Sequence, residues 1–169
     1  MTPRASGHEM ELEGHGIVEN IMSRQALEQL LHGQIPLSRA MQIAAVEVTE
    51  ESVQLSAPLA PNLNQHATAF GGSASALAML AAWSLLHVRL RGSFPSVAIV
   101  IQRHSISYDR PIQGAFAARA VLAQPADWPR FLRLLTRRGK ARITVASTLD
   151  YAGEQTGHFT GDFVAFDRH

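Results

Sequence analysis

Two adjacent glycines before a long apolar stretch are the feature of this sequence best suited to chemistry. Gly71 and Gly72 stand where that stretch is expected to begin as a helix, and glycine has no Cβ to keep a ligand from the backbone. The unpaired N–H groups of a first helical turn, at the positive end of the helix dipole, can hold a carbonyl oxygen. They stabilise that oxygen more strongly when a reaction gives it negative charge. Alternatively, the two glycines only allow a helix to pack tightly on a sheet.

Several polar side chains near these glycines are candidates for moving protons. His66 lies shortly before them, and an imidazole that exchanges protons near neutral pH can activate water. Ser75 falls in the first turns of the expected helix and can face a pocket, whereas Ser73 can complete the helix cap. Asp109 is the best-placed acid if a partner subunit brings its strand end to the helix. Simpler interpretations are a surface histidine, ordinary helix serines and a turn carboxylate paired with Arg110.

Composition limits the classes of site and partner. The chain has no cysteine, which excludes a disulfide framework, a thiolate nucleophile and a cysteine-ligated metal, and which suits the reducing cytoplasm. A formal net charge of +1 over 169 residues carries no signature of nucleic-acid or membrane binding. We therefore expect no metal, no cofactor, no nucleic acid and no membrane partner. Seven of the eight histidines lack the spacing of a metal site: His8, His15, His32, His87, His104, His158 and His169.

The apolar stretch at residues 71–91 is expected to be a buried helix. It is rich in alanine and leucine, and its continuous apolar part is shorter than the ~20 residues that a membrane-spanning helix needs. A helix that is apolar on nearly all sides must be surrounded by protein, and its alanines allow another element to pack closely. A strongly twisted sheet wrapped around the helix would meet this requirement.

The remaining sequence supplies strands for such a sheet. Apolar alternation and short apolar runs predict strands at 39–49, 52–57, 97–101 extended toward 108, 115–123, 141–151 and 158–166, and helices at 23–33 and 127–139. The run at 97–101 is apolar at every position, which is typical of a central strand covered on both faces. The length fits one domain. We expect residues 1–20 to be a flexible arm and residues 21–169 a single domain.

The loop before the helix resembles the loop-to-helix signature of hotdog thioesterases, in which an Asn precedes a Thr, then an aromatic residue or His, then Gly-Gly. The matching residues are Asn64, Thr68, Phe70, Gly71 and Gly72. With Phe before Gly-Gly-Ser, the segment looks most like the thioesterase domain of the YiiD C-terminal type. The Tyr-Asp-Arg-Pro run at 108–111 is similar to a strand-turn common in the superfamily. The resemblance implies an α+β hotdog fold, in which a curved antiparallel sheet wraps a long central helix.

The resemblance also implies a function. Hotdog thioesterases hydrolyse acyl-CoA or acyl-carrier-protein thioesters, and the substrate carbonyl would be polarised here by the Gly72 N–H. Asn64 matches the asparagine that orients the attacking water or the carbonyl, although a loop asparagine is also a common turn residue. The expected assembly is a homodimer or a dimer of dimers. The expected substrate-binding residues along this segment are Thr68, Phe70, Gly71, Ser73 and Met79.

Three positions depart from the family pattern, among them Phe70 in place of a frequent His and Ala67 in place of an upstream Gly. Many hotdog thioesterases have a carboxylate seven residues after the second glycine, where this chain has Met79, and the expected helix contains no Asp or Glu. The usual base is therefore absent, and we expect His66, Ser75 or Asp109 to assist, in that order. Met79 is expected to be pocket wall or core. Two other functions stay open: a non-catalytic module that binds acyl thioesters, and a hotdog hydratase or dehydratase with His66 as its base.

Basic residues cluster on the second predicted helix. Arg130, Arg133 and Arg137 share one face, with Arg138 and Lys140 close behind. A solvated face whose positive charges complement the C-terminal end of the helix dipole would explain them. The functional interpretation is a docking patch for the phosphates of coenzyme A or for an acidic acyl carrier protein, the anionic carriers that the resemblance implies.

Overall fold

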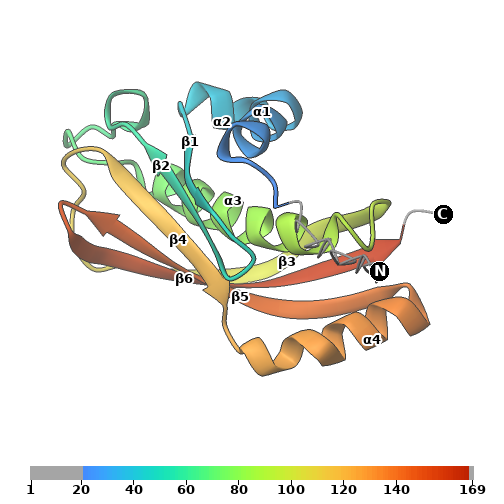
Figure 1. Ribbon diagram of the computed structural model, residues 1–169. Helices are drawn as coiled ribbons and strands as arrows, with labels where there is room; N and C mark the ends of the chain where they lie inside the picture. The colour runs from blue at the N-terminus through green and yellow to red at the C-terminus, as the bar shows by residue number, and fades with distance from the viewer. Residues whose placement is uncertain (1–20, 168–169) are drawn as a thin grey trace, which may run out of the picture.

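The computed structural model describes residues 21–167, so the flexible arm expected at residues 1–20 lies outside the described residues, as do residues 168 and 169. The elements appear in the following order (Figure 1): α1 (Arg24–Gln34), α2 (Pro36–Ala40), β1 (Ala44–Val48), β2 (Ser52–Ala57), the short 3-10 helix η1 (Ala60–Asn62), α3 (Gly71–Leu90), β3 (Val97–Tyr108), β4 (Phe116–Leu122), the 3-10 helix η2 (Pro125–Asp127), α4 (Trp128–Arg138), β5 (Lys140–Tyr151) and β6 (Glu154–Asp167).

A six-stranded sheet curves around the long helix α3 (Figure 1). The strand order is β1-β2-β4-β5-β6-β3, and every neighbouring pair is antiparallel. Buried and less buried residues alternate along β4 and β5, because alternate side chains of a strand point toward the helix. The predicted arrangement of a curved antiparallel sheet around one central helix is confirmed.

Small side chains bring α3 close to the sheet. Ala78, Ala81 and Ala82 are fully buried, and the Ser147 hydroxyl of β5 donates a hydrogen bond of 2.9 Å to the Ala78 carbonyl oxygen. By length and composition α3 could cross a membrane, but 61% of its apolar window is buried inside this protein. Its apolar character is therefore that of a core helix.

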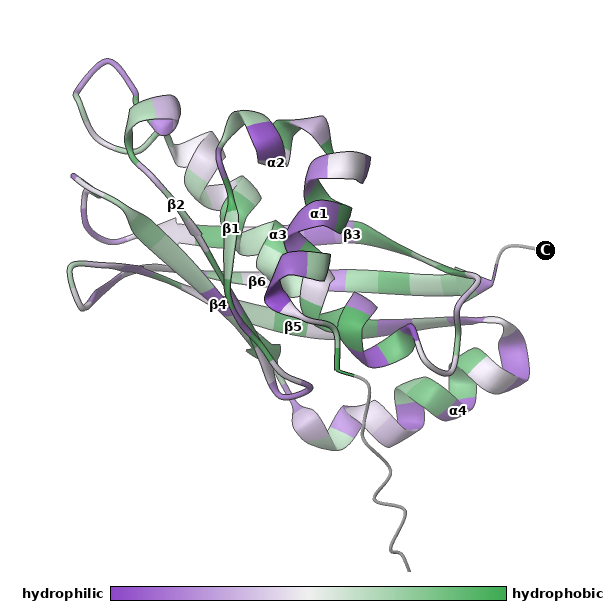
Figure 2. Cartoon of the chain, turned by 45° about the horizontal axis from the view of Figure 1, so that its top comes forward, coloured by the Kyte–Doolittle hydropathy of each residue, from purple (hydrophilic) through white to green (hydrophobic). Residues whose placement is uncertain are grey.

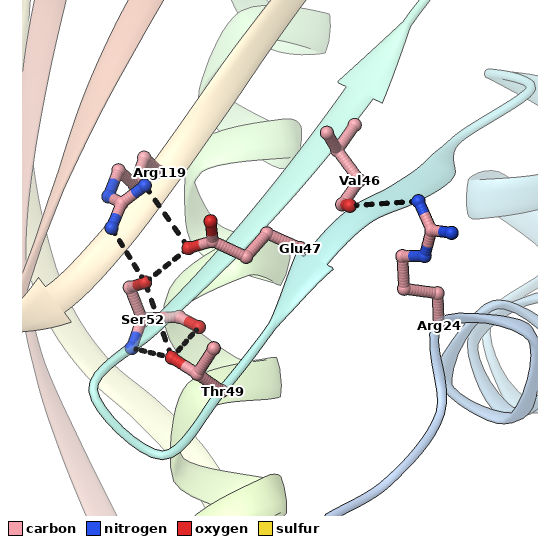
Figure 3. Close-up of polar contacts among 6 residues, drawn as sticks. All are labelled: Arg24, Val46, Glu47, Thr49, Ser52 and Arg119. Carbon is pink, nitrogen blue, oxygen red and sulfur yellow. Dashed lines mark hydrogen bonds and ion pairs between the residues drawn. The ribbon is translucent and has the colours of Figure 1, made fainter.

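Helix α1 protects the β1 edge of the sheet with side chains. The Glu28 carboxylate accepts a hydrogen bond from the Ala45 N–H at 3.1 Å, and the Arg24 guanidinium donates one to the Val46 carbonyl oxygen at 3.3 Å (Figure 3). His32 Nε2 donates to the Ile43 carbonyl oxygen at 2.8 Å, just before β1 begins. These three contacts occupy backbone groups that an unprotected edge strand would offer to another chain.

A polar network fixes the hairpin between β1 and β2 (Figure 3). The Arg119 guanidinium of β4 lies 3.1 Å from Glu47 Oε1 and donates to the Ser52 hydroxyl at 2.9 Å. Ser52 in turn donates to Glu47 Oε1 at 2.6 Å, while the Ser52 N–H donates to the Thr49 hydroxyl at 3.0 Å. Strands β1, β2 and β4 are therefore tied together at this end.

Strand β3 forms the other edge of the sheet, so the prediction that residues 97–101 are a central strand is wrong. β3 pairs only with β6, and Val100 is 46% exposed. The run is apolar for two separate reasons. Ile99 and Ile101 pack against the core, whereas Val100 lies on the outer surface of the sheet. The β3–β6 register shifts between Ile101 and Arg103, which is where the apolar run gives way to polar residues.

Helix α4 continues from β4 and packs beside β5. Phe131 and Leu135 are buried, and apolar and hydrophilic residues alternate around the helix (Figure 2). Gly139 ends it in the left-handed conformation at φ 64°, as predicted, whereas the expected cap residue Asp127 makes no side-chain capping hydrogen bond. The Arg89 guanidinium of α3 lies 4.1 Å above the Trp128 ring and links the end of α3 to α4.

Two predicted strand boundaries differ from the structure. The strand expected at 39–49 begins only at Ala44, because residues 36–40 form the short helix α2 instead. Pro36 is its first residue, a position where the fixed φ of proline suits a helix and its missing N–H is not needed. The last strand is longer than the expected 158–166 and runs from Glu154 to Asp167. The cap at Ser23 is confirmed, since its hydroxyl accepts a hydrogen bond from the Ala26 N–H at 3.1 Å.

Candidate active site at the start of helix α3

The start of α3 has no side-chain cap. Phe70 is the cap residue and has no polar side-chain atom, and its carbonyl oxygen accepts a hydrogen bond from the Ala74 N–H at 3.1 Å. Within residues 21–167, no acceptor takes the N–H of Gly71, Gly72 or Ser73. These three donors are therefore available to an oxygen atom of a ligand at the positive end of the helix dipole.

Two aromatic rings flank the paired glycines. A Cβ on Gly71 would lie 3.4 Å from the Tyr108 ring, and a Cβ on Gly72 would lie only 2.3 Å from Phe70 Cε1. The glycines therefore face aromatic side chains and not the backbone of the sheet. Gly71 thus packs against a side chain of β3, and at neither position is the nearest neighbour of an added Cβ the sheet backbone. Tyr108 also donates a hydrogen bond of 2.8 Å from its hydroxyl to the Gly71 carbonyl oxygen.

A cavity of about 290 Å³ opens beside this helix start. Its wall combines the start of α3 with the segment that follows β3, and these segments are joined by a hydrogen bond of 2.8 Å from the Ala69 N–H to the Ile112 carbonyl oxygen. The lining residues are Ala69, Gly71, Ala74, Tyr108, Asp109, Arg110, Pro111 and Ile112. Asp109 thus lines the same cavity as Gly71 within one chain. The sequence-based expectation was that a partner subunit would have to bring it there.

Asn64 fixes the loop before the helix through both atoms of its side-chain amide. Oδ1 accepts hydrogen bonds from the His66 N–H at 2.8 Å and the Thr68 N–H at 3.1 Å. Nδ2 donates to the Thr68 hydroxyl at 2.8 Å and to the Ala69 carbonyl oxygen at 3.4 Å. Orienting a water or a carbonyl would require Asn64 to exchange one of these contacts, so that role stays a prediction beside its role in the loop.

His66 lies in the loop before α3, whereas Asp109 follows β3 and lines the cavity at the helix start. His66 is exposed on the loop, and among residues 21–167 its ring has one hydrogen-bond partner, the Gln65 side chain, at 3.3 Å. Asp109 lies 3.5 Å from the His158 imidazole of β6. The expected pair of Asp109 with Arg110 is wrong, because Arg110 pairs with Glu154. The contact to His158 could not be predicted from the sequence, because it depends on the pairing of β3 with β6, two strands far apart in the chain.

Ser73, Ser75 and Met79 lie in α3 and are partly exposed. Ser75 and Met79 stand eight and four residues before Trp83, so the three share one face of the helix. That face looks toward β3, because the Trp83 indole donates a hydrogen bond of 3.1 Å to the Ile99 carbonyl oxygen. Met79 also packs against the hydrophobic core, in agreement with its expected place in a pocket wall or core.

The arginines of α4 lie far from this helix start within one chain. Arg130, Arg133 and Arg137 are exposed, and Arg130 lines a cavity of about 340 Å³ together with Arg142 of β5. The start of α4 contacts Arg89, which stands 17 residues after Gly72, or about 26 Å along the helix at ~1.5 Å per residue. The described structure thus does not bring α4 and the glycines together in a single chain.

Groups with shifted pKa values lie away from the helix start. A hydrogen bond from the Thr144 hydroxyl, together with the Arg103 guanidinium, holds the pKa of Asp162 below its usual range. Burial lowers the pKa of His87, and the positive charge of Arg91 adds to the effect. Both pKa shifts follow from the immediate surroundings of the group, on the sheet for Asp162 and near the end of α3 for His87. Neither shift marks a catalytic acid or base.

Residues 24–167 match the family model described as "Putative thioesterase (yiiD_Cterm)". The chain belongs to this thioesterase family. The match covers the helix start, its loop and the whole sheet, and it confirms both the predicted thioesterase class and the resemblance to the YiiD C-terminal type.

Solved structures of other proteins share this fold. A protein of unknown function from Chlorobaculum tepidum TLS is 22% identical, with a TM-score of 0.80 over 88% of this chain and 99% of its own. A "putative thioesterase" from Shewanella oneidensis is 28% identical, with a TM-score of 0.72 over 85% and 96%. A thioesterase from Haemophilus influenzae is 13% identical, with a TM-score of 0.69 over 86% and 91%. The predicted hotdog fold is confirmed.

Proposed function

We propose that this thioesterase hydrolyses acyl-CoA or acyl-carrier-protein thioesters at the start of α3. The observation that carries the proposal is the set of free N–H groups on Gly71, Gly72 and Ser73 beside a cavity of about 290 Å³. A thioester carbonyl oxygen placed on these donors becomes more strongly bound as it turns into an oxyanion, which lowers the barrier to hydrolysis. Thr68 and Phe70 would line the entry to this site, and Ser75 and Met79 the path of the acyl chain.

The reaction needs one water and no cofactor. The water oxygen forms a bond to the carbonyl carbon, and the carbonyl electron pair moves onto the oxygen that the Gly72 N–H holds. When the tetrahedral intermediate collapses, the C–S bond breaks and the thiolate leaves with its electron pair. The proton lost by the water ends on the thiolate, so the products are a carboxylic acid and a free thiol. His66 is our first candidate to carry that proton, before Ser75 and Asp109.

A thiol-release assay tests the proposal. The purified protein is incubated with a panel of acyl-CoAs and an acylated carrier protein, and the released thiol is detected. Thiol release from at least one substrate supports it. Tight binding of an acyl-CoA without thiol release would favour the non-catalytic binding module, and hydration of an enoyl-CoA would favour the hydratase. The hydratase is the weaker alternative, because α3 contains no acidic residue.

We also propose a cytoplasmic location, since the sequence contains no cysteine.

Two substitutions in the loop test its part in catalysis. We expect Asn64→Ala to lower kcat/KM by about 10–10²-fold, because the loop loses the hydrogen bonds that position it. If His66 is the base, His66→Ala should lower kcat by about 10²-fold and remove the acidic limb of the pH–rate profile, since an imidazolium cannot accept the water proton. Gln124→Ala, at an exposed position outside this loop, is the control and should retain activity. Full activity in both test variants would contradict the mechanism.

We also propose that two copies pair through their β3 edges. The two edges of the sheet differ: three α1 side chains occupy the backbone at β1, whereas in the described chain the contacts to the free-edge backbone of β3 lie near its start, from the Trp83 indole and the Phe94 carbonyl oxygen. A 12-residue edge strand with exposed Val100 requires a cover. If the two β3 strands pair antiparallel, the two central helices also run in opposite directions, because each α3 runs antiparallel to its own β3. The resulting assembly is a dimer or a dimer of dimers.

Sedimentation equilibrium tests this pairing. The wild-type protein is expected to be dimeric or tetrameric at micromolar concentration. Val100→Glu is expected to weaken the dimer at least about tenfold, because it places a charge on each of the two edge strands that pair. Val121→Glu is the matched control, because Val121 is similarly exposed at 40% but lies on β4, inside the sheet. A stable wild-type monomer would contradict the proposal.

The basic face of α4 is proposed to bind the anionic carrier of the substrate. Within one chain α4 adjoins the later part of α3, so a helix pair running in opposite directions would bring α4 nearer to the partner's helix start than to its own. The positive charges of Arg130, Arg133 and Arg137 would there attract the phosphates of coenzyme A or an acidic carrier protein.

Reversing these three charges should raise KM much more than it lowers kcat. Attraction to the carrier contributes to binding before the chemical step, and its loss therefore appears in KM. The variant with Arg130, Arg133 and Arg137 all changed to Glu should also show a flatter dependence of KM on salt, because there is no attraction left to screen. Arg39→Glu, on α2, is the control. An unchanged KM and salt response would make these arginines an ordinary solvated face.

A further inference from the structure

Tyr108 contacts the same peptide group that carries the Gly72 N–H. The carbonyl of Gly71 and the N–H of Gly72 belong to one planar amide, and the Tyr108 hydroxyl donates to that carbonyl oxygen at 2.8 Å. We propose that Tyr108 is a positioning residue for thioester hydrolysis, which holds this amide in place and strengthens its N–H as a donor. The proposal rests on the proposed function of the helix start.

The effect follows from the electronic structure of the amide. A hydrogen bond accepted by the carbonyl oxygen draws electron density toward that oxygen and leaves the N–H of the same amide more positive. The Gly72 N–H then binds a developing oxyanion more strongly than a neutral carbonyl. The tyrosine consequently acts mainly on the transition state.

The location of Tyr108 suits this role. It is the last residue of β3, where it pairs with Gly157 of β6, and the following residue is held by a hydrogen bond of 2.8 Å from the Asp109 N–H to the Thr156 carbonyl oxygen. The phenol is therefore anchored in the sheet, while the amide that it contacts belongs to the helix. Its ring also forms part of the wall of the 290 Å³ cavity. A bond between two independently held elements limits the rotation of the first peptide groups of α3.

Substrate binding would strengthen the contact. Tyr108 is 54% exposed in the free chain, so water competes for its hydroxyl. A substrate in the adjoining cavity would cover the ring and exclude that water, and hydrogen bonds are electrostatically stronger in such a medium. A tyrosine that served only for packing would act through its ring, and its hydroxyl would be dispensable.

Tyr108→Phe removes the hydroxyl and keeps the ring against Gly71. We expect kcat to fall about three- to tenfold, the effect of one modest hydrogen bond, with KM and the melting temperature nearly unchanged. Tyr151→Phe is the matched control, because Tyr151 is the other tyrosine of the chain, and no hydrogen bond involves its hydroxyl among residues 21–167. Its kcat should equal that of the wild type.

A second measurement does not depend on turnover. The backbone ¹⁵N signal of Gly72 in the free protein should move upfield in Tyr108→Phe, because its amide carbonyl loses a donor, and should stay in place in Tyr151→Phe. An unchanged Gly72 signal, or an unchanged kcat, would overturn the role of Tyr108 even if the wild type is a thioesterase. Failure of the wild type to release thiol from any acyl-CoA or acyl carrier protein would instead overturn the proposed function, and the role of Tyr108 with it.

Discussion

Replacing the Gly72 N–H with an ester oxygen is expected to lower kcat by about 10²–10³-fold, the usual effect of losing one oxyanion donor. Glycolic acid at position 72 makes this change without adding a side chain that would collide with Phe70. The fold should survive, because within the described residues this N–H has no acceptor. Single-turnover measurement of thiol release would separate the chemical step from product release.

The matched control is an ester at Ala74. The Ala74 N–H donates to the Phe70 carbonyl oxygen at 3.1 Å, so lactic acid at this position removes a hydrogen bond of the helix. We expect a loss of about 1 kcal/mol in the free energy of unfolding and a much smaller effect on kcat. Equal losses of kcat at positions 72 and 74 would mean that general weakening of the helix, and not a lost oxyanion donor, explains the result.

Gly157→Ala is expected to destabilise the protein by about 3 kcal/mol or more. A Cβ at this buried position would lie 2.4 Å from the Ser107 carbonyl oxygen, and backbone held in the β3–β6 ladder cannot move aside without breaking that pairing. For a chain of this size, about 1 kcal/mol corresponds to roughly 2–4 °C in melting temperature. Thermal unfolding followed by circular dichroism would measure the loss. Activity should fall as well, since Tyr108 pairs directly with Gly157.

Gly161→Ala, in the same strand, is the control for this substitution. Its new Cβ would meet the ring of Phe159 at 2.8 Å and that of Phe163 at 3.1 Å, which are side-chain atoms and not backbone. We expect a smaller loss of stability, because rings can shift where a strand cannot. If both variants lost the same stability, crowding of the core would be the cause, and the Ser107 contact would have no special weight.

The central part of the fold could be predicted because its signals are local. A long stretch that is apolar on nearly all sides, rich in alanine and opened by two glycines describes a helix enclosed by a sheet, and α3 is that helix. The glycine at the end of α4 and the serine before α1 each specify a boundary through their own backbone or side-chain chemistry. The loop motif around Asn64 completed the prediction through its resemblance to a family.

The position of β3 could not be predicted in the same way. A run of apolar residues predicts that both sides of a strand are covered, but it does not identify what covers each side or whether the same chain does so. Ile99 meets α3, whereas Val100 faces outward on an edge strand. Sheet order is a property of the whole chain, since β3 pairs with β6, which lies about fifty residues later.

The same limit applies to the candidate site. The double glycine and Asn64 stand in one short segment, so the sequence could identify them together. Tyr108 meets Gly71, and His158 meets Asp109, only through the packing and pairing of strands, and no spacing in the sequence connects the two members of either pair. The four hydrogen bonds of the Asn64 amide likewise depend on the exact path of the loop and not on the residue type alone.

The contacts from Glu28, Arg24 and His32 to the backbone at β1 also determine how far association can proceed. A protein with two unprotected sheet edges can add further copies at both edges and grow into a filament. A protein with one unprotected edge can pair through it with only one other copy, with two-fold symmetry. In this chain one edge is already occupied by its own first helix. Association through β3 would therefore stop at two copies, and α1 would prevent the sheet from extending into a polymer.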